Sequence, residues 1–205
     1  MENTQTIKLA IFASGAGSNT REIINFFKSS HLVEVVLIAG NNLKSGVATI
    51  AKDEGLPFLW FDKKRFYDDG YVTDIGSYNL DLIILAGFMW KIPLTILNKY
   101  PGKIINIHPA LLPKYGGKGM FGMHVHKAVI EAKEKESGIT IHYVDEFYDH
   151  GNIIFQKRCI VEPSDTPETL ANKIHELEHE HYPVVIQEEI TKAESKARRS
   201  SWVSI

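Results

Sequence analysis

Short apolar runs alternate along the first half of the chain with segments of helical character. The runs occur at residues 7–13, 33–39, 57–61, 80–86 and 104–107. Apolar runs without polar alternation are typical of parallel strands that are buried on both faces of a sheet. Helices are predicted between them, at residues 20–28, 47–54 and 63–77. This order predicts an α/β fold with a doubly wound, mostly parallel sheet and right-handed crossovers.

The pattern changes after the fifth predicted strand. Residues 109–123 are rich in glycine and proline, which predicts a functional loop. Beyond it we predict a helix at 125–135, strands at 139–144 and 153–160, and a long helix from Thr166 to about Ile190. The sheet then has about seven strands. The polar residues after Thr191 are expected to fray.

Composition narrows the class of protein. Hydrophobic residues make up 44% of the 205 residues and charged residues 23%, and no repeat or linker divides the chain, so we expect one domain over residues 1–205. The net charge of −2 gives no reason to expect nucleic acid or an anionic membrane as a partner. The lone Cys159 excludes an internal disulfide.

The polar N-terminus does not look like a signal peptide, and no apolar stretch approaches the roughly 18 residues of a membrane span. We therefore expect a cytoplasmic protein.

A glycine-rich turn, SGAGSN at residues 14–19, joins the first predicted strand to the first helix. Glycines let the backbone approach an anion, and the N–H groups at a helix start point towards it. Ligands of open α/β sheets also bind at the carboxyl ends of the strands. The turn lacks the third glycine of a dinucleotide fingerprint and the lysine of a Walker motif. A phosphate monoester is therefore the predicted ligand, and a purely structural turn is the alternative.

Asn106 and His108 stand at the end of the fifth predicted strand, before Pro109. Because side chains alternate along a strand, these two share one side of it. An amide and an imidazole together suit one carbonyl oxygen, since Asn106 can donate a hydrogen bond and His108 can donate one or deliver a proton. On this segment alone, a hydrogen-bonded structural histidine is an equally open interpretation.

Asp149 belongs to an Asp-His-Gly sequence after the sixth predicted strand. A carboxylate beside His108 would favour the imidazolium, orient the ring and hold a water molecule for proton transfer. An Asp-x-Gly sequence is more often a structural turn, so the residues alone do not assign Asp149 to the site.

Three other groups of residues are candidates for a metal site or a binding site. His175 and His179 match the zinc motif H-E-x-x-H, but no third ligand follows them, so we predict a solvated helix face and no metal. His124 and His126 could bind metal or phosphate, or cluster by chance. The aromatic and methionine residues of Phe88–Trp90 could pack in the core or line a site for a flat heterocycle.

Taken together, these segments resemble the phosphoribosylglycinamide formyltransferases, the glycinamide ribonucleotide transformylases of purine biosynthesis. The matching motifs are GSN at 17–19, LAGFM at 85–89, INIHPALLPKY at 105–115, and His-Tyr-Val followed by Asp-x-Gly between 142 and 151. Their order along residues 7–190 is specific, although each motif alone is weak. The resemblance implies a Rossmann-like formyltransferase fold, a formyl donor, 10-formyltetrahydrofolate, and an amine acceptor, glycinamide ribonucleotide. It implies phosphate binding in residues 7–100, catalysis and folate binding in 101–190, and a polar tail at 191–205.

The resemblance also implies roles for individual residues. Asn106, His108 and Asp149 match the family's catalytic residues, in which the aspartate raises the histidine pKa and helps to position a water molecule. The phosphate loop and the glutamate that contacts the glycinamide portion correspond to Gly17, Ser18, Asn19 and Glu178. The folate-lining residues correspond to Met89, Trp90, Lys91, Ile92, Asn106 and Val144, with a further donor contact at Lys64 or, after a shift by one, at Arg65.

The chain departs from the family pattern at three places. Trp90-Lys91-Ile92 stands where many relatives have Arg-Ile-Leu, which alters the expected pterin contacts. The segment 116–123 looks longer and richer in glycine than the loop of many relatives, and its glycines would ease closure over a substrate. Asp149-His150-Gly151 replaces a common Asp-Gly-Gly.

Other functions remain open at this point. A formyltetrahydrofolate hydrolase would carry a regulatory domain, and a methionyl-tRNA formyltransferase an RNA-binding barrel; from the length of the chain we expect neither. A phosphate-binding module would explain SGAGSN but not Asn106, His108 and Asp149, and a zinc hydrolase would use His175 and His179. We expect a formyltransferase for small molecules, without metal, nucleic acid or membrane, as a monomer or homodimer.

Overall fold

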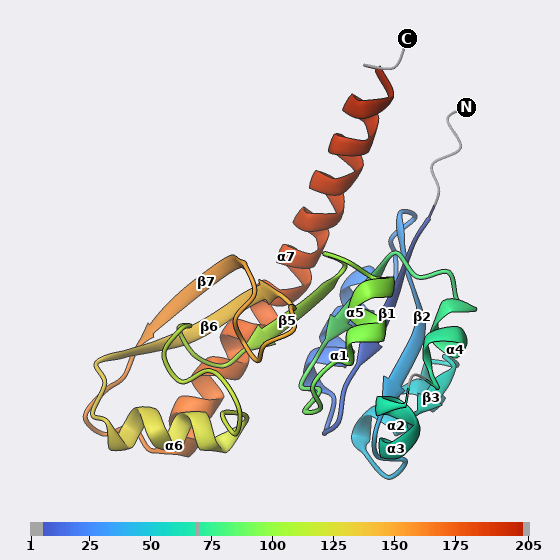
Figure 1. Cartoon of the computed structure of the whole chain (residues 1–205). Helices are drawn as coiled ribbons and strands as arrows, with labels where there is room; N and C mark the ends of the chain where they lie inside the picture. Colours follow the sequence, from blue (N-terminus) through green and yellow to red (C-terminus); the bar gives the residue numbers. More distant parts are fainter. Residues whose placement is uncertain (1–5, 69, 203–205) are drawn as a thin grey trace.

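Seven strands form one sheet in the computed structural model, which describes residues 6–68 and 70–202, with side chains up to residue 195 (Figure 1). The strands are β1 (Ile7–Phe12), β2 (Val33–Gly40), β3 (Phe58–Trp60), β4 (Leu82–Leu85), β5 (Ile104–His108), β6 (Glu136–Tyr143) and β7 (Ile153–Ile160). Their order is β3-β2-β1-β4-β5-β6-β7. Neighbours from β3 to β5 pair in parallel, whereas β5–β6 and β6–β7 pair antiparallel. The predicted α/β fold with a mostly parallel sheet of about seven strands is confirmed.

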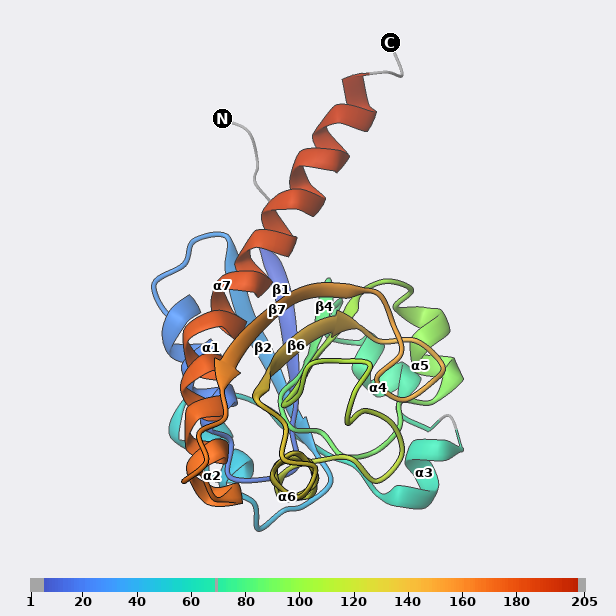
Figure 2. The ribbon, with the colours of Figure 1, turned by 90° about the vertical axis from the view of Figure 1, so that its left-hand side faces the viewer.

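Helices cover both faces of this sheet, as the view along its edge in Figure 2 shows. One face packs against α1 (Ser18–Phe27), α2 (Gly46–Asp53), α6 (Met123–Glu131) and α7 (Pro167–Trp202). The other packs against α3 (Lys63–Tyr67), α4 (Val72–Gly76) and α5 (Leu94–Lys99). The result is a three-layer α/β/α arrangement with one apolar core on each side of the sheet.

The two cores explain the unbroken apolar runs in the sequence. Along β1, Leu9 and Ile11 point into the first core, whereas Ala10 and Phe12 point into the second. All four are fully buried. A central strand covered on both faces has no solvent side, so polar residues are excluded from it.

Several element boundaries differ from the predictions. The single helix predicted at 63–77 is two short helices, α3 and α4, and the helix predicted at 125–135 is α6, which begins and ends earlier. β6 starts at Glu136, three residues before the predicted strand. Helix α5 was not predicted, because six residues after Pro93 are too few to show a periodic pattern.

The predicted end of the last helix near Ile190 is wrong. Helix α7 continues to Trp202, and both ribbon views show its C-terminal part projecting beyond the rest of the molecule (Figures 1 and 2). Residues 191–201 contain no glycine or proline and include several Lys, Ala, Arg and Glu residues, which favour helix. The predictions for residues 1–5 and 203–205 lie outside the described residues.

No helix within residues 6–68 and 70–202 combines the length and the apolar character that crossing a bilayer requires.

Candidate active site

The end of β5 brings four polar side chains together on one face of the sheet. In the antiparallel register with β6, Asn106 lies opposite His142 and His108 lies opposite Thr140. The alternate residues, such as Ile107, belong to the core on the other face. Strand periodicity thus places Asn106 and His108 on one side, as predicted, and adds two residues of β6 to them.

His108 is buried, with 3% of its surface exposed, and each of its ring nitrogens faces an oxygen atom. Nε2 donates a 2.8 Å hydrogen bond to the carbonyl oxygen of Tyr115. Nδ1 lies 3.5 Å from Oδ1 of Asp149, which is longer than an ordinary hydrogen bond. Because the Tyr115 carbonyl takes the Nε2 hydrogen, Nδ1 is the nitrogen that can exchange a hydrogen bond or a proton with a substrate.

Asn106 is oriented by His142, a residue to which the sequence motifs gave no role. The Asn106 amide nitrogen donates a 3.1 Å hydrogen bond to Nε2 of His142, and His142 Nδ1 donates a 2.8 Å hydrogen bond to the Tyr143 carbonyl. Burial lowers the pKa of His142, which suits the neutral ring that this pattern requires. The alternation of Ile139, Thr140, Ile141 and His142 is the sequence signal that places His142 on the polar face.

Asp149 is held in the left-handed region of backbone space, with φ of 52°. Its Oδ2 accepts a 2.9 Å hydrogen bond from the backbone N–H of Gly117, and Oδ1 faces both His108 and, at 3.8 Å, Nε2 of His142. Gly151 is required nearby, since a Cβ atom there would lie 1.9 Å from the Tyr143 carbonyl oxygen. The Asp-x-Gly sequence is therefore a structural turn that also carries its aspartate to His108.

The glycine-rich turn after β1 has the backbone of an anion-binding loop. Gly17 is the N-cap residue of α1 and has a φ of 84°, and a Cβ at this position would lie 2.7 Å from the Ile50 side chain. No side chain caps the start of α1. A cavity of about 470 Å³ opens beside the turn and is bordered by Gly17, Ser18 and Arg21 among others. Backbone N–H groups and one guanidinium group are thus available to a phosphate.

The turn is connected to the other predicted site segments. Asn19 Nδ2 donates a 2.9 Å hydrogen bond to Oε2 of Glu178 on α7, so the structure joins these two predicted residues. Ser14 Oγ accepts a 3.2 Å hydrogen bond from the backbone N–H of Met89. Since β1, β4 and β5 are neighbours in the sheet, the turns after β1 and β4 lie beside the end of β5.

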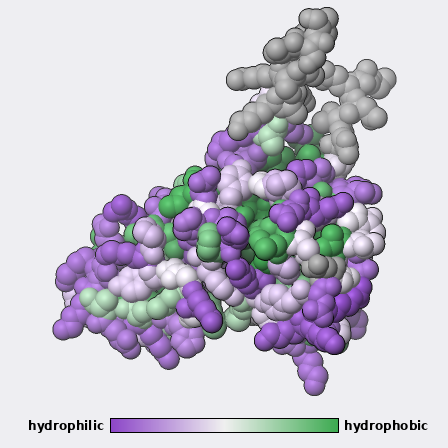
Figure 3. Space-filling model, viewed as in Figure 1, coloured by the Kyte–Doolittle hydropathy of each residue, from purple (hydrophilic) through white to green (hydrophobic). Residues whose placement is uncertain are grey.

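The residues predicted to line a folate site follow β4 and β6. Met89 is 51% exposed, whereas Ile92 is buried in the second core and Val144 packs against it. The Trp90 ring lies 5.5 Å from Phe66, centroid to centroid. On the face shown in Figure 3, hydrophobic residues gather in the middle, flanked by hydrophilic surface. Met89 and the half-buried Trp90 and Val144 offer an apolar surface to a flat ring, whereas the side chain of Ile92 is buried beneath it.

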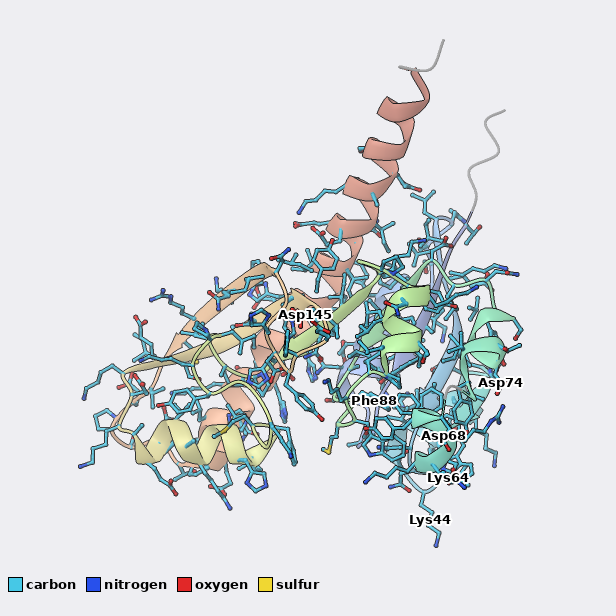
Figure 4. The ribbon with its side chains drawn as sticks, viewed as in Figure 1. Lys44, Lys64, Asp68, Asp74, Phe88 and Asp145 are labelled. Carbon is cyan, nitrogen blue, oxygen red and sulfur yellow. The ribbon has the colours of Figure 1, made fainter. Side chains whose placement is uncertain are left out.

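Lys64 and Arg65, the two candidates for a further donor contact, differ in their surroundings. Arg65 is engaged within the protein: its Nη2 donates a 2.8 Å hydrogen bond to the Gly70 carbonyl, and its guanidinium lies 4.2 Å from the Tyr71 ring centroid. Lys64 is exposed on α3, and in Figure 4 it lies well to the side of Asp145, which marks the loop after β6. Lys64 is therefore the better candidate to bind an anionic group of the donor, at a distance from the end of β5.

The H-E-x-x-H motif forms no metal centre in the described part of the chain. The rings of His175 and His179 stack with their centroids 6.4 Å apart, and no group of three or more His, Cys, Asp or Glu among these residues is placed to hold a metal ion. Glu178, the second of the two glutamates in this segment, faces Asn19 instead.

His126 is a buried residue that the sequence left undecided. It is 2% exposed, and burial lowers its pKa to about 4, with smaller contributions from His175 and His108. Its Nδ1 has no hydrogen-bond partner among the described atoms. The buried ring at the start of α6 is therefore neutral at neutral pH, and it is close enough to His108 for the two to interact electrostatically.

Comparison with known proteins gives concordant matches. The sequence profile of one protein family, described as formyl transferase, matches residues 7–186. The chloroplastic phosphoribosylglycinamide formyltransferase of Arabidopsis thaliana is 42% identical over 186 residues, which cover 87% of this chain and 64% of that protein. The phosphoribosylglycinamide formyltransferase of Bacillus subtilis is 37% identical over 187 residues, covering 88% of this chain and 93% of that one. The chain thus spans less than two thirds of the plant relative and almost all of the bacterial one.

A solved structure gives the same result. The crystal structure of phosphoribosylglycinamide formyltransferase from Bacillus Halodurans superposes with a TM-score of 0.82 at 36% sequence identity. The match covers 91% of this chain and 96% of that chain. The resemblance drawn from the ordered sequence motifs is confirmed.

Proposed function

The chain belongs to the formyl transferase family, and from this premise we propose that it transfers the formyl group of 10-formyltetrahydrofolate to the amine of glycinamide ribonucleotide. The products are formylglycinamide ribonucleotide and tetrahydrofolate, and the reaction belongs to de novo purine biosynthesis. The observation that carries the proposal is the convergence of Asn106, Nδ1 of His108 and Asp149 at the end of β5. The 37% identity to the full-length Bacillus subtilis enzyme supports it.

The reaction begins when the neutral amine attacks the formyl carbon. The new C–N bond forms as the carbonyl electron pair moves to oxygen, where negative charge develops. Asn106 donates the amide hydrogen that His142 leaves unused, and His108 donates from Nδ1 in its protonated form. Donors fixed before the reaction stabilise such a charge without reorganisation.

The second half of the reaction moves one proton. The attacking nitrogen must lose a proton, and the donor nitrogen must gain one as its bond to the formyl carbon breaks. Asp149 is positioned for this transfer, since its carboxylate lies beside Nδ1 of His108 and can order a water molecule between the two nitrogens.

The binding segments suit the two substrates. The turn at Gly17–Asn19 would hold the phosphate of the ribonucleotide, and Glu178 would contact its glycinamide portion. The apolar surface around Met89, Trp90, Ile92 and Val144, with Lys91 beside it, would receive the pterin ring, and Lys64 an anionic part of the donor. Both substrates are small molecules, and we place the activity in the cytoplasm, of a monomer or homodimer.

A spectrophotometric assay tests the proposal. The protein is mixed with 10-formyltetrahydrofolate, with and without glycinamide ribonucleotide, and the folate absorbance is followed. Turnover that requires the acceptor supports the transferase. Turnover without the acceptor indicates a hydrolase instead, and no turnover in either mixture leaves only a binding module.

A further inference from the structure

Tyr115 is anchored at both of its ends. Its carbonyl oxygen accepts the 2.8 Å hydrogen bond from Nε2 of His108. Its hydroxyl group donates a 3.0 Å hydrogen bond to Oε1 of Glu134, which also accepts 2.9 Å from Lys114 Nζ. Tyr115 thus connects the imidazole of His108 to Glu134, which lies in the turn between α6 and β6 and is ion-paired with Lys114.

The backbone at Tyr115 is strained. Its φ is 55°, in the left-handed region that tyrosine rarely adopts. Four non-glycine residues in the described part of the chain have a positive φ; the others are Asn79, Lys133 and Asp149. Two of the four, Tyr115 and Asp149, face the two nitrogens of His108, and Lys133 directly precedes Glu134. Such strain persists only where surrounding contacts hold it, and it gathers at functional sites.

The Tyr115 carbonyl determines which ring nitrogen of His108 can exchange a proton. A carbonyl oxygen only accepts, so Nε2 must carry a hydrogen in both the neutral and the protonated ring. The proton that comes and goes is then the one on Nδ1, which faces Asp149. If the carbonyl turned away, the hydrogen of the neutral ring could be on either nitrogen. Part of the population would then carry it on Nδ1 instead of Nε2.

We propose that Glu134 is a positioning residue for His108: it holds the Tyr115 hydroxyl, and thereby the carbonyl that keeps the hydrogen of the catalytic ring on Nε2. This inference rests on the proposed role of His108 in formyl transfer. Glu134 itself makes no contact with His108 in the structure; its partners are Tyr115 and Lys114. The hydrogen bond from Lys114, followed by the one from Tyr115, lowers the pKa of the Glu134 carboxyl group, so the glutamate stays charged at neutral pH. Burial, followed by the contact with Glu134, raises the pKa of the Tyr115 hydroxyl group.

Glu136 provides a matched control. Both glutamates border the same cavity of about 290 Å³, and both form ion pairs, Glu136 with Nη1 of Arg158 at 2.8 Å. Only Glu134 contacts Tyr115. Because both side chains reach solvent, their replacement by alanine opens no void in either core.

Steady-state kinetics on the full chain test the inference. We expect Glu134→Ala and Tyr115→Phe each to lower kcat about 3- to 10-fold, the effect of one hydrogen bond, with both KM values within about twofold of wild type. The double variant should be no slower than the slower single one, because both remove the same contact. Glu134→Gln should recover most of kcat, since its amide oxygen still accepts from the tyrosine. Glu136→Ala should match wild type.

A second measurement does not depend on turnover. The ¹⁵N chemical shifts of the His108 ring, assigned by their loss in His108→Gln, report which nitrogen carries the hydrogen. We expect Nε2–H in wild type and Glu136→Ala, and a mixture of tautomers in Glu134→Ala. If Glu134→Ala equals Glu136→Ala in both kcat and ring shifts, the inference is overturned. If wild type shows no formyl transfer, the proposed function fails, and the ring shifts still decide whether Glu134 positions His108.

Discussion

Asn19 donates a 2.9 Å hydrogen bond from its amide nitrogen to Oε2 of Glu178, joining the turn after β1 to α7. Glu178 is 6% exposed, and burial raises the pKa of its carboxyl group, although the hydrogen bond from Asn19 opposes the shift. Folding alone therefore favours the neutral carboxyl group. A carboxylate kept at a cost in stability is typical of a binding or catalytic position.

Replacing Glu178 by glutamine should stabilise the protein at neutral pH. Glutamine keeps an oxygen that accepts from Asn19 and removes the buried charge. Because the folded-state pKa of Glu178 is raised above 4.5, its contribution to stability is complete at low pH and is lost as pH rises through the raised pKa. We expect a higher Tm than wild type at pH 7.5, and a difference that shrinks towards pH 4.5. The exposed neighbour Glu180, replaced in the same way, should show no such trend, and a pH-independent difference would contradict the explanation.

The same Glu178→Gln variant should bind the acceptor more weakly. Loss of a charged hydrogen-bond acceptor for the substrate amine is expected to raise KM for glycinamide ribonucleotide about 10-fold or more. KM for the formyl donor should stay within about twofold of wild type. The surface proposed for the donor is formed by residues that follow β4 and β6 and does not include Glu178. An equal rise in both KM values would show that the substitution disturbs the whole site.

Removing either oxyanion donor should act on the chemical step. We expect Asn106→Ala and His108→Ala each to lower kcat by at least about 10²-fold, with smaller changes in either KM. Thermal unfolding measured alongside identifies any loss of fold. Near-wild-type turnover in His108→Ala would remove this residue from the mechanism.

The variant Asp149→Asn removes the charge of this side chain but keeps its shape. Asparagine can still accept from the Gly117 N–H, but it removes the negative charge 3.5 Å from Nδ1 of His108. Asparagine therefore offers no negative charge to the proton that is transferred. We expect a lower kcat, with a Tm close to that of wild type. An unchanged kcat would argue that Asp149 acts only as a structural turn.

The layered fold could be predicted from the sequence because burial on both faces leaves a direct pattern. The residues of β1 that enter the two cores, such as Leu9 and Phe12, allow no polar substitution, so the strand appears as one apolar run. Helix α5 and the extension of α7 lack such a pattern. The former is too short, and the latter contacts too little of the sheet for burial to select its residues. Its helicity comes from propensity, which is a weaker signal.

The site was predictable only in part for a similar reason. Asn106 and His108 are two residues apart on one strand, so periodicity alone places them together. Asp149, His142 and the Tyr115 carbonyl reach His108 through pairing of β5 with β6 and through loops of left-handed backbone. A single sequence contains no direct record of such contacts. The ordered family motifs supplied Asp149, but they left His142 and Glu134 unassigned.

Because the imidazole of His126 is buried, we predict that the stability of the protein depends on pH. Burial, and to a lesser degree His175 and His108, lowers its folded-state pKa to about 4 from an ordinary 6.5. Between these values the unfolded chain binds the proton more readily, so the folded state loses stability as pH falls from 6.5 to about 4. The loss should reach at most about 3.5 kcal/mol, since the pKa falls by about 2.5 units and one unit corresponds to about 1.4 kcal/mol. Urea unfolding of His126→Gln should lose less stability over this window, whereas the exposed His31→Gln should follow wild type; parallel curves for all three would place the acid sensitivity elsewhere.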